Sequence, residues 1–108
     1  MSPISSDSVG TATVLQAEFE RLAAEWKQET EHLSSVVAIA KHRAYQEIIG
    51  MGNEAIPFIL RDLEESSSQW FWALRSIAGE SPVRPEDRGD VDAMTAAWLD
   101  WGRRKLYI

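Results

Sequence analysis

The chain has 108 residues, of which 17 are acidic and 11 are basic, giving a net charge of −6. This length fits one domain, and a composition of 44% hydrophobic and 26% charged residues excludes wholesale disorder. The lack of cysteine excludes disulfides, thiolate nucleophiles and cysteine-ligated zinc, and no stretch approaches the roughly 20 apolar residues of a membrane helix.

Residues 1–12 are rich in Ser, Thr, Gly and Pro, with Ile4 and Val9 as sizeable apolar side chains. Such a composition has little to bury and predicts a flexible tail, followed by a single helical domain over residues 13–108. The same stretch lacks the basic and apolar regions of a secretory signal, so we expect a cytoplasmic protein.

A first helix is predicted from about Thr13 to Leu33. Its apolar stripe follows alternating spacings of four and three residues and consists of Leu15, Phe19, Leu22, Trp26 and Leu33. The opposite face is the most acidic part of the chain and includes Glu18 and Glu25. Two heptads are too few for a coiled coil, so we favour a helix that packs across its own domain. A homo-oligomer formed through residues 15–33 is the alternative.

A second helix is predicted over about residues 36–49, with Ser34 and Ser35 able to cap its start. The string Gly50-Met51-Gly52 ends it, because glycine adopts the left-handed C′ conformation at low steric cost.

A third helix is predicted from an N-cap at Asn53 to about Glu65, with Pro57 at its fourth position. Its amphipathic face consists of Ile56, Ile59, Leu60 and Leu63.

After the loop Ser66-Ser67-Ser68, a fourth helix is predicted from Trp70 to a stop at Gly79. Two prolines make residues 81–89 an extended connector. A fifth helix, capped by Asp90 or Asp92, then carries an apolar face of Val91, Met94, Trp98 and Trp101. No segment alternates with period two, so the sequence predicts an all-α fold, a compact bundle of about five helices.

The stretch from Gly52 to Gly79 resembles a HEAT-type repeat: a glycine, Pro57, an apolar helical face, a polar turn, then Ala73-Leu74 and a closing glycine. The resemblance covers about a quarter of the chain and implies a HEAT-like central helical hairpin. Because one such unit cannot bury both faces, the flanking helices would have to cap it.

A longer resemblance covers residues 34–108. Its motifs are the run from His42 to Gly52, the string Trp70-Phe71-Trp72-Ala73-Leu74-Arg75, the prolines and charges of 82–89, and Ala97-Trp98-Leu99-Asp100-Trp101-Gly102. These resemble a small family of uncharacterised bacterial proteins, which implies a bacterial source and no particular activity. Arg43 stands where that family's pattern has proline.

Residues that could carry catalysis or bind a metal are sparse. His32 and His42 lie ten apart without a partner at zinc-binding spacing, and no serine sits in a G-x-S-x-G elbow. The acids between Glu86 and Asp92 do not follow the order of a calcium-binding loop and are better explained by capping and solvation. We therefore predict no catalytic residues, no metal site and no cofactor.

Nucleic acid is not expected as a partner. The Gly50-Met51-Gly52 turn could mimic a helix-turn-helix, but the following segment, Asn53 to Asp62, has one base, two acids and a proline where base contacts would be made. A net charge of −6 also opposes phosphate binding.

Five tryptophans are the unusual feature of the composition. Four lie on predicted apolar faces and are expected in the core: Trp26, Trp70, Trp98 and Trp101. Trp72, two residues beyond Trp70 on one helix, cannot share its face. We expect it either to be covered by the proline rings of the connector, which we favour, or to be exposed as a binding surface.

These features predict a protein-protein interaction module rather than an enzyme, possible roles being a small acidic neutralising or adaptor partner of another bacterial protein. The predicted partner-binding residues are Trp70, Trp72, Trp98, Trp101, Glu18 and Glu25, with the acidic helix steering a basic protein partner. The alternative is a small-molecule-binding protein or enzyme with a tryptophan-lined pocket, in which Tyr45, His42 and Asp87 would supply polar groups.

Overall fold

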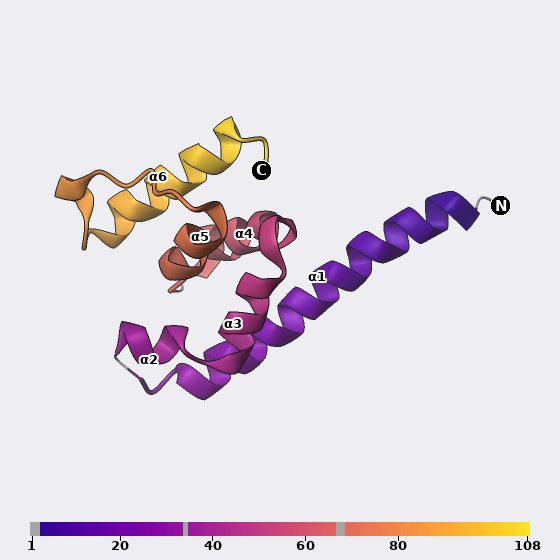
Figure 1. Ribbon diagram of the computed structural model, residues 1–108, viewed down its shortest axis with the longest axis horizontal. Helices are drawn as coiled ribbons and strands as arrows, with labels where there is room; N and C mark the ends of the chain where they lie inside the picture. Colours follow the sequence, from indigo (N-terminus) through magenta and orange to yellow (C-terminus); the bar gives the residue numbers. More distant parts are fainter. Residues whose placement is uncertain (1–2, 34, 67–68) are drawn as a thin grey trace.

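The computed structural model describes residues 3–33, 35–66 and 69–108, with the backbone alone over residues 3–13. The described residues form six α-helices and two short 3-10 helices and contain no strand, which confirms the predicted all-α fold (Figure 1). The elements are α1 (Pro3–Thr30), α2 (Val36–Ala40), α3 (Arg43–Gly50), η1 (Gly52–Ala55), α4 (Ile56–Ser66), α5 (Phe71–Ala78), η2 (Pro85–Asp87) and α6 (Val91–Arg104).

Helix α1 begins at Pro3, ten residues before the predicted Thr13, so the backbone of residues 3–12 is helical where a tail was predicted. Met1 and Ser2 lie outside the described residues. In Figure 1 the N-terminal part of this 28-residue helix extends past all the other helices. The helix ends at Thr30, and Leu33 beyond it is 37% exposed, so placing Leu33 in the buried stripe was wrong. The middle of the stripe is confirmed, because Phe19, Leu22 and Trp26 are buried.

The predicted second helix is two helices, α2 and α3, separated at Lys41 and His42. The break arises because His42 adopts an extended conformation and its Nδ1 accepts a hydrogen bond from the backbone N–H of Ala44 at 3.0 Å, which caps α3. Ser35 caps α2 as predicted, by accepting from the N–H of Ala38. Ser34 lies outside the described residues.

The turn before α4 also differs from the prediction. Gly52 has a positive φ of 72°, as expected of a glycine that ends a helix, but Asn53 lies inside η1 and does not cap the next helix. Helix α4 starts only at Ile56, so Pro57 is its second residue, where the missing N–H has no intrahelical acceptor.

The C-terminal elements follow the prediction closely. Gly79 ends α5 in the left-handed conformation with φ of 75°. The connector contains the short η2, and the carboxylate of Asp90 accepts a hydrogen bond from the N–H of Ala93, capping α6.

The helices pack in a chain of neighbours, α1 against α3, α3 against α5, and α4 against α6. Helices α4 and α5, the pair covered by the HEAT-type resemblance, also contact each other, although the resemblance itself stays a prediction. Helix α1 thus packs on residues of its own chain through the face that the alternative of self-association would need.

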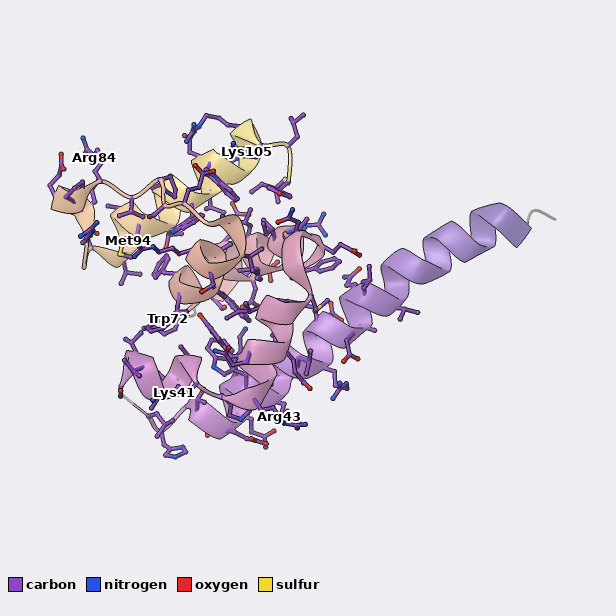
Figure 2. The ribbon with its side chains drawn as sticks, viewed as in Figure 1. Lys41, Arg43, Trp72, Arg84, Met94 and Lys105 are labelled. Carbon is purple, nitrogen blue, oxygen red and sulfur yellow. The ribbon has the colours of Figure 1, made fainter. Side chains whose placement is uncertain are left out.

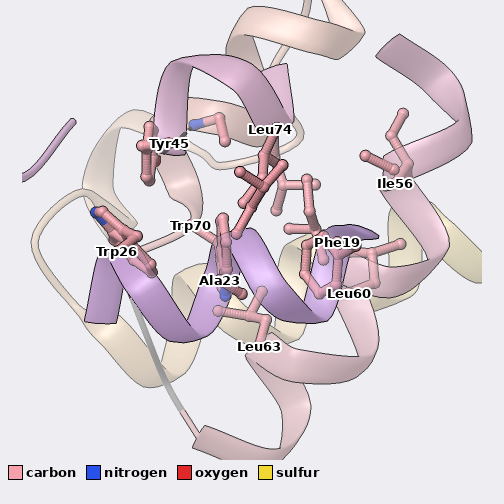
Figure 3. Packing of buried hydrophobic residues seen from close by; sticks show 14 of the residues in the cluster. Phe19, Ala23, Trp26, Tyr45, Ile56, Leu60, Leu63, Trp70 and Leu74 are labelled. Atoms are coloured by element: carbon pink, nitrogen blue, oxygen red, sulfur yellow. Dashed lines mark hydrogen bonds between the residues drawn. The ribbon is translucent and has the colours of Figure 1, made fainter. Parts of the chain in front are cut away.

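The centre of the packing is an inner aromatic cluster, which we define as Phe19, Trp26, Tyr45 and Trp70 (Figure 3). The rings of Trp26 and Trp70 have centroids 4.6 Å apart, and Tyr45 stacks on Trp70 at 5.6 Å. The apolar residues of α4 surround this cluster, as the predicted face of Ile56, Ile59, Leu60 and Leu63 is wholly buried.

None of the helices in the described part of the chain combines the length and the apolar character needed to cross a membrane.

Candidate functional site

The two tryptophans at the start of α5 have opposite environments. Trp70, immediately before the helix, is wholly buried, whereas Trp72 is 47% exposed. Successive helical residues are rotated by about 100°, so side chains two positions apart lie on nearly opposite sides. Of the two alternatives predicted for Trp72, covered by the connector or exposed, the structure shows the exposed one.

Three polar contacts fix the orientation of α5 and hence the direction of Trp72. The Tyr45 hydroxyl donates to the carbonyl of Gln69 at 2.8 Å and accepts from the N–H of Ala73 at 2.9 Å. The indole Nε1 of Trp70 donates to the Asp62 carboxylate at 2.6 Å. Burial raises the pKa of the Tyr45 phenol, and the backbone hydrogen bond from Ala73 opposes this only in part. Tyr45 therefore acts as a neutral structural group.

The Asp62 carboxylate is also held by Lys27, whose Nζ lies 2.8 Å from Oδ1. Partial burial raises the pKa of Asp62, but the hydrogen bonds from Lys27 and Trp70 and the charge of Lys27 outweigh burial, so the pKa lies below its ordinary value. An ionised Asp62 thus links α1, α4 and the start of α5.

On the outer side of α5, Trp72 lines an open groove with a volume of about 850 Å³, which we call the Trp72 groove. Its walls come from Gln69 and α5, residues 79–89, three residues of α6 and one residue of α2. The lining residues are Val36, Gln69, Phe71, Trp72, Arg75, Gly79, Glu80, Ser81, Val83, Arg88, Gly89, Val91, Met94 and Trp98. In Figure 2, Trp72 lies between α2 and the start of α6, near Met94.

Much of the groove lining is apolar and in contact with solvent. Val36 is 48% exposed and Val91 is 44% exposed, values close to that of Trp72. Phe71, Val83 and Met94 are half-buried beside them. The prediction that Val91 belongs to a buried face of its helix was wrong, because this first residue of α6 lies at the groove and not in the core.

The connector contributes to the groove, but not as predicted. Val83, Arg88 and Gly89 line it together with Trp72, whereas neither proline of the connector is a lining residue. Trp72 is consequently left half-exposed rather than covered by proline rings.

The other predicted partner-binding tryptophans are inside the molecule. Trp70 is wholly buried, Trp98 is 1% exposed and Trp101 is 5% exposed. Trp98 reaches the groove from the core side, and Trp101 instead stacks on Tyr107 with ring centroids 5.5 Å apart. Of the four residues, Trp72 alone presents a large surface to a partner.

The predicted acidic residues lie on α1 and are not lining residues of the groove. Glu18 pairs with Arg21 at 2.6 Å, and Glu25 lies 3.5 Å from Arg43. Both carboxylates therefore have cationic neighbours within the chain, which weakens the field available to steer a basic partner.

The polar groups suggested for a small-molecule pocket are not at the groove either. Tyr45 is buried under α5, and Asp87 pairs with Arg84 at 3.0 Å. Nε2 of His42 is 2.6 Å from the Glu29 carboxylate, while its Nδ1 accepts a hydrogen bond from the backbone as a cap. In the portion that the structure describes, no three His, Asp or Glu side chains are grouped so as to hold a metal ion.

The sequence reasoning missed the groove residues that accompany Trp72. Arg75, Arg88 and Val83 fall within the stretches that carry the family resemblance, but no sequence pattern assigns them a role, and only their positions around Trp72 single them out. The usable signal was the spacing of Trp70 and Trp72, because two large aromatics two positions apart on a helix cannot both be buried on one side.

Comparison with known proteins gives no relative: no protein-family model, no curated protein and no solved structure matches the chain. The predicted resemblances stay predictions.

Proposed function

We propose that this chain is a non-enzymatic protein-interaction module and that its partner docks in the Trp72 groove. The observation that carries the proposal is the indole of Trp72, 47% exposed in a groove while the other four tryptophans are buried. Tryptophan is enriched among the residues that contribute most to binding energy, and contiguous exposed apolar surface marks interaction sites.

The neighbours of Trp72 support a docking surface. Val36 and Val91 extend the exposed apolar area on either side, and half-buried Met94 offers an adaptable side chain for a partner to pack against. The groove is not enclosed, and Trp72, Val36 and Val91 in its lining are about half-exposed, so an occupant would stay partly in solvent. Small-molecule sites instead bury most of the ligand surface, so an open groove favours a segment of a larger molecule.

The finer form of the proposal is a small acidic neutralising or adaptor partner of another bacterial protein in the cytoplasm. Its support is the short chain of 108 residues, the net charge of −6 and the resemblance of residues 34–108 to a bacterial family. Size and charge are analogies with proteins of that kind.

A small-molecule-binding protein remains the second candidate, favoured by one observation. The volume of about 850 Å³ falls within the range of roughly 300–1,000 Å³ of ligand sites, and two indoles, Trp72 and Trp98, line it.

Site-specific photo-cross-linking in the cells of origin tests the proposal. Benzoylphenylalanine is placed at Val36 or Val91 in the groove and, as the control, at Val14 of α1, which is 65% exposed and is not a lining residue. We expect one protein adduct of defined mass from both groove positions and none from Val14.

Binding of the protein identified in this way should then fall at least about 30-fold on Trp72→Ala with the circular dichroism spectrum unchanged, the loss typical of an interface hot spot. Groove positions that give no protein adduct, or the same adducts as Val14, would contradict the proposal and favour the small-molecule candidate.

A further inference from the structure

We infer that the Trp72 groove accepts an acidic segment of its protein partner, which places an apolar side chain on Trp72 and carboxylates on Arg75 and Arg88. This inference rests on the proposed function and names the chemistry of the partner. It reverses the expectation that an acidic surface of this chain recruits a basic partner.

The first observation is that both arginines of the groove lack a carboxylate partner within the described part of the chain. Arg75 and Arg88 line the groove and are exposed, and neither forms an ion pair with any described residue. Arg75 lies in the last turn of α5, where a cation also suits the helix dipole. Arg88 follows η2 in the connector and has no such explanation.

Most other cations of the chain form ion pairs with described residues, although Lys41 and Arg61, which lie outside the groove, do not. Arg21 binds Glu18 at 2.6 Å, Lys27 binds Asp62 at 2.7 Å, and Arg104 binds Asp100 at 3.0 Å. The chain as a whole has six more acids than bases. The two groove arginines, which form no ion pair with a described residue, therefore give the groove a local charge opposite in sign to the net charge of the chain.

The second observation concerns the acid at the groove. Among the lining residues the acidic side chain is Glu80, and it is engaged elsewhere. Its carboxylate accepts from Trp101 Nε1 at 3.1 Å and lies 3.7 Å from Lys105 Nζ. Glu80 is therefore directed toward Trp101 and Lys105 and forms no ion pair with Arg75 or Arg88, so an incoming carboxylate meets two guanidinium groups that have no ion-pair partner among the described residues.

Apolar and cationic surfaces occur together in this groove, and the combination determines the chemistry of the segment that binds there. Trp72, Val36 and Val91 require an apolar side chain, and the arginines require acidic groups beside it. Guanidinium groups bind carboxylates through two parallel hydrogen bonds, which fixes register as well as adding affinity. A polypeptide segment that alternates apolar and acidic residues satisfies both requirements.

The probe for the test is a library of random short peptides, selected on the full chain at low salt and counter-selected on Trp72→Ala. We expect enrichment of peptides with net negative charge and a large apolar residue. The net charge of −6 would enrich basic peptides if bulk attraction governed binding, so an acidic outcome cannot come from non-specific electrostatics. Enrichment of basic or uncharged peptides, or no enrichment, would overturn the inference.

Charge-neutral variants then locate the contact. Binding of the best peptide should fall about tenfold in Arg75→Gln/Arg88→Gln, the sum expected of two exposed ion pairs, and should weaken with added salt. Arg61→Gln is the matched control, because Arg61 is also exposed and without an ion pair to a described residue but lies outside the groove, and it should leave binding unchanged. Equal losses in the double variant and in Arg61→Gln would overturn the assignment.

Two further measurements exclude other occupants. Phenylacetate that displaces the peptide at equal concentration would show that a small carboxylate suffices, and self-association abolished by Trp72→Ala would show that a second copy fills the groove. Either result overturns the inference. If the peptide selection shows no acidic preference but the groove positions still cross-link to a protein, the inference about the partner's charge fails and the proposed interaction module stands. The two failures are therefore distinguishable.

Discussion

The two sides of α5 carry the same residue type in opposite settings. On the inner side, Trp70 is wholly buried, contacts Phe19, Trp26 and Tyr45, and its Nε1 is satisfied by Asp62. On the outer side, Trp72 is half-exposed in a groove with two arginines that form no ion pair with a described residue. The inner indole thus has both its ring and its N–H partnered by the chain, whereas the outer indole is left half in solvent at the groove.

The largest expected effect on stability comes from replacing Trp70 by alanine, and the same replacement at Trp72 is the comparison. Trp70→Ala should lower the free energy of unfolding by about 3–5 kcal/mol, because it leaves a cavity among packed rings and removes one hydrogen bond from the Asp62 carboxylate. Trp72→Ala should lower it by only about 1 kcal/mol, because half of that indole is already in water. Urea unfolding of both variants measures the contrast, and equal losses would show that the outer side of α5 is as structural as the inner side.

An intermediate effect is expected at Asp62, which satisfies the inner indole. The pKa of Asp62 is lowered in the folded chain relative to the ordinary 3.8, so its ionised form contributes stability that is fully present above that value. This contribution is lost as the pH falls below 3.8 through the lowered pKa.

Asp62→Asn removes this dependence and should cost about 1 kcal/mol near pH 7, the worth of charged rather than neutral hydrogen bonds. The difference in unfolding free energy between the wild type and Asp62→Asn, measured from pH 6 to pH 2, should shrink at the acidic end; a constant difference would exclude an ionisation effect.

The smallest effect probes how tightly the interior is packed. A Cβ at Gly102 of α6 would overlap Leu60 Cδ1, whose side chain is wholly buried. Gly102→Ala should therefore cost about 1 kcal/mol, because overpacking exceeds the gain in helix propensity. Gly50→Ala is the matched control: a Cβ there meets no atom within 4 Å, so the variant should be as stable as the wild type or slightly more so. Thermal unfolding of both variants compares them, and a destabilised Gly50→Ala would undermine the packing argument.

Much of the helical core was predictable from the sequence. The face of α4, the glycine stop of α5 and the Asp90 cap follow from local patterns, and local patterns are what sequence periodicity records. The α2–α3 break was missed because His42 caps through an imidazole nitrogen, which is not among the usual capping groups. The early start of α1 was missed because Ser, Thr and Gly are weak helix formers.

The groove was predictable only at Trp72 itself. Its other walls come from α2, the connector and α6, and their meeting depends on tertiary packing that no local pattern encodes. Val91 illustrates the difficulty, because its spacing from Trp98 fits a buried face while its position at the start of α6 places it past the core.

The inner aromatic cluster joins rings from separate parts of the chain: Phe19 and Trp26 come from α1, Tyr45 from α3 and Trp70 from the start of α5. Rings held within 4.6–5.6 Å in fixed orientations couple their electronic transitions, and near-ultraviolet circular dichroism vanishes when such packing is lost. The near-ultraviolet circular dichroism signal of this cluster therefore reports whether the N-terminal helix is packed against the rest of the chain. Trp72, on the far side of α5, is left free to signal occupancy of the groove by its fluorescence.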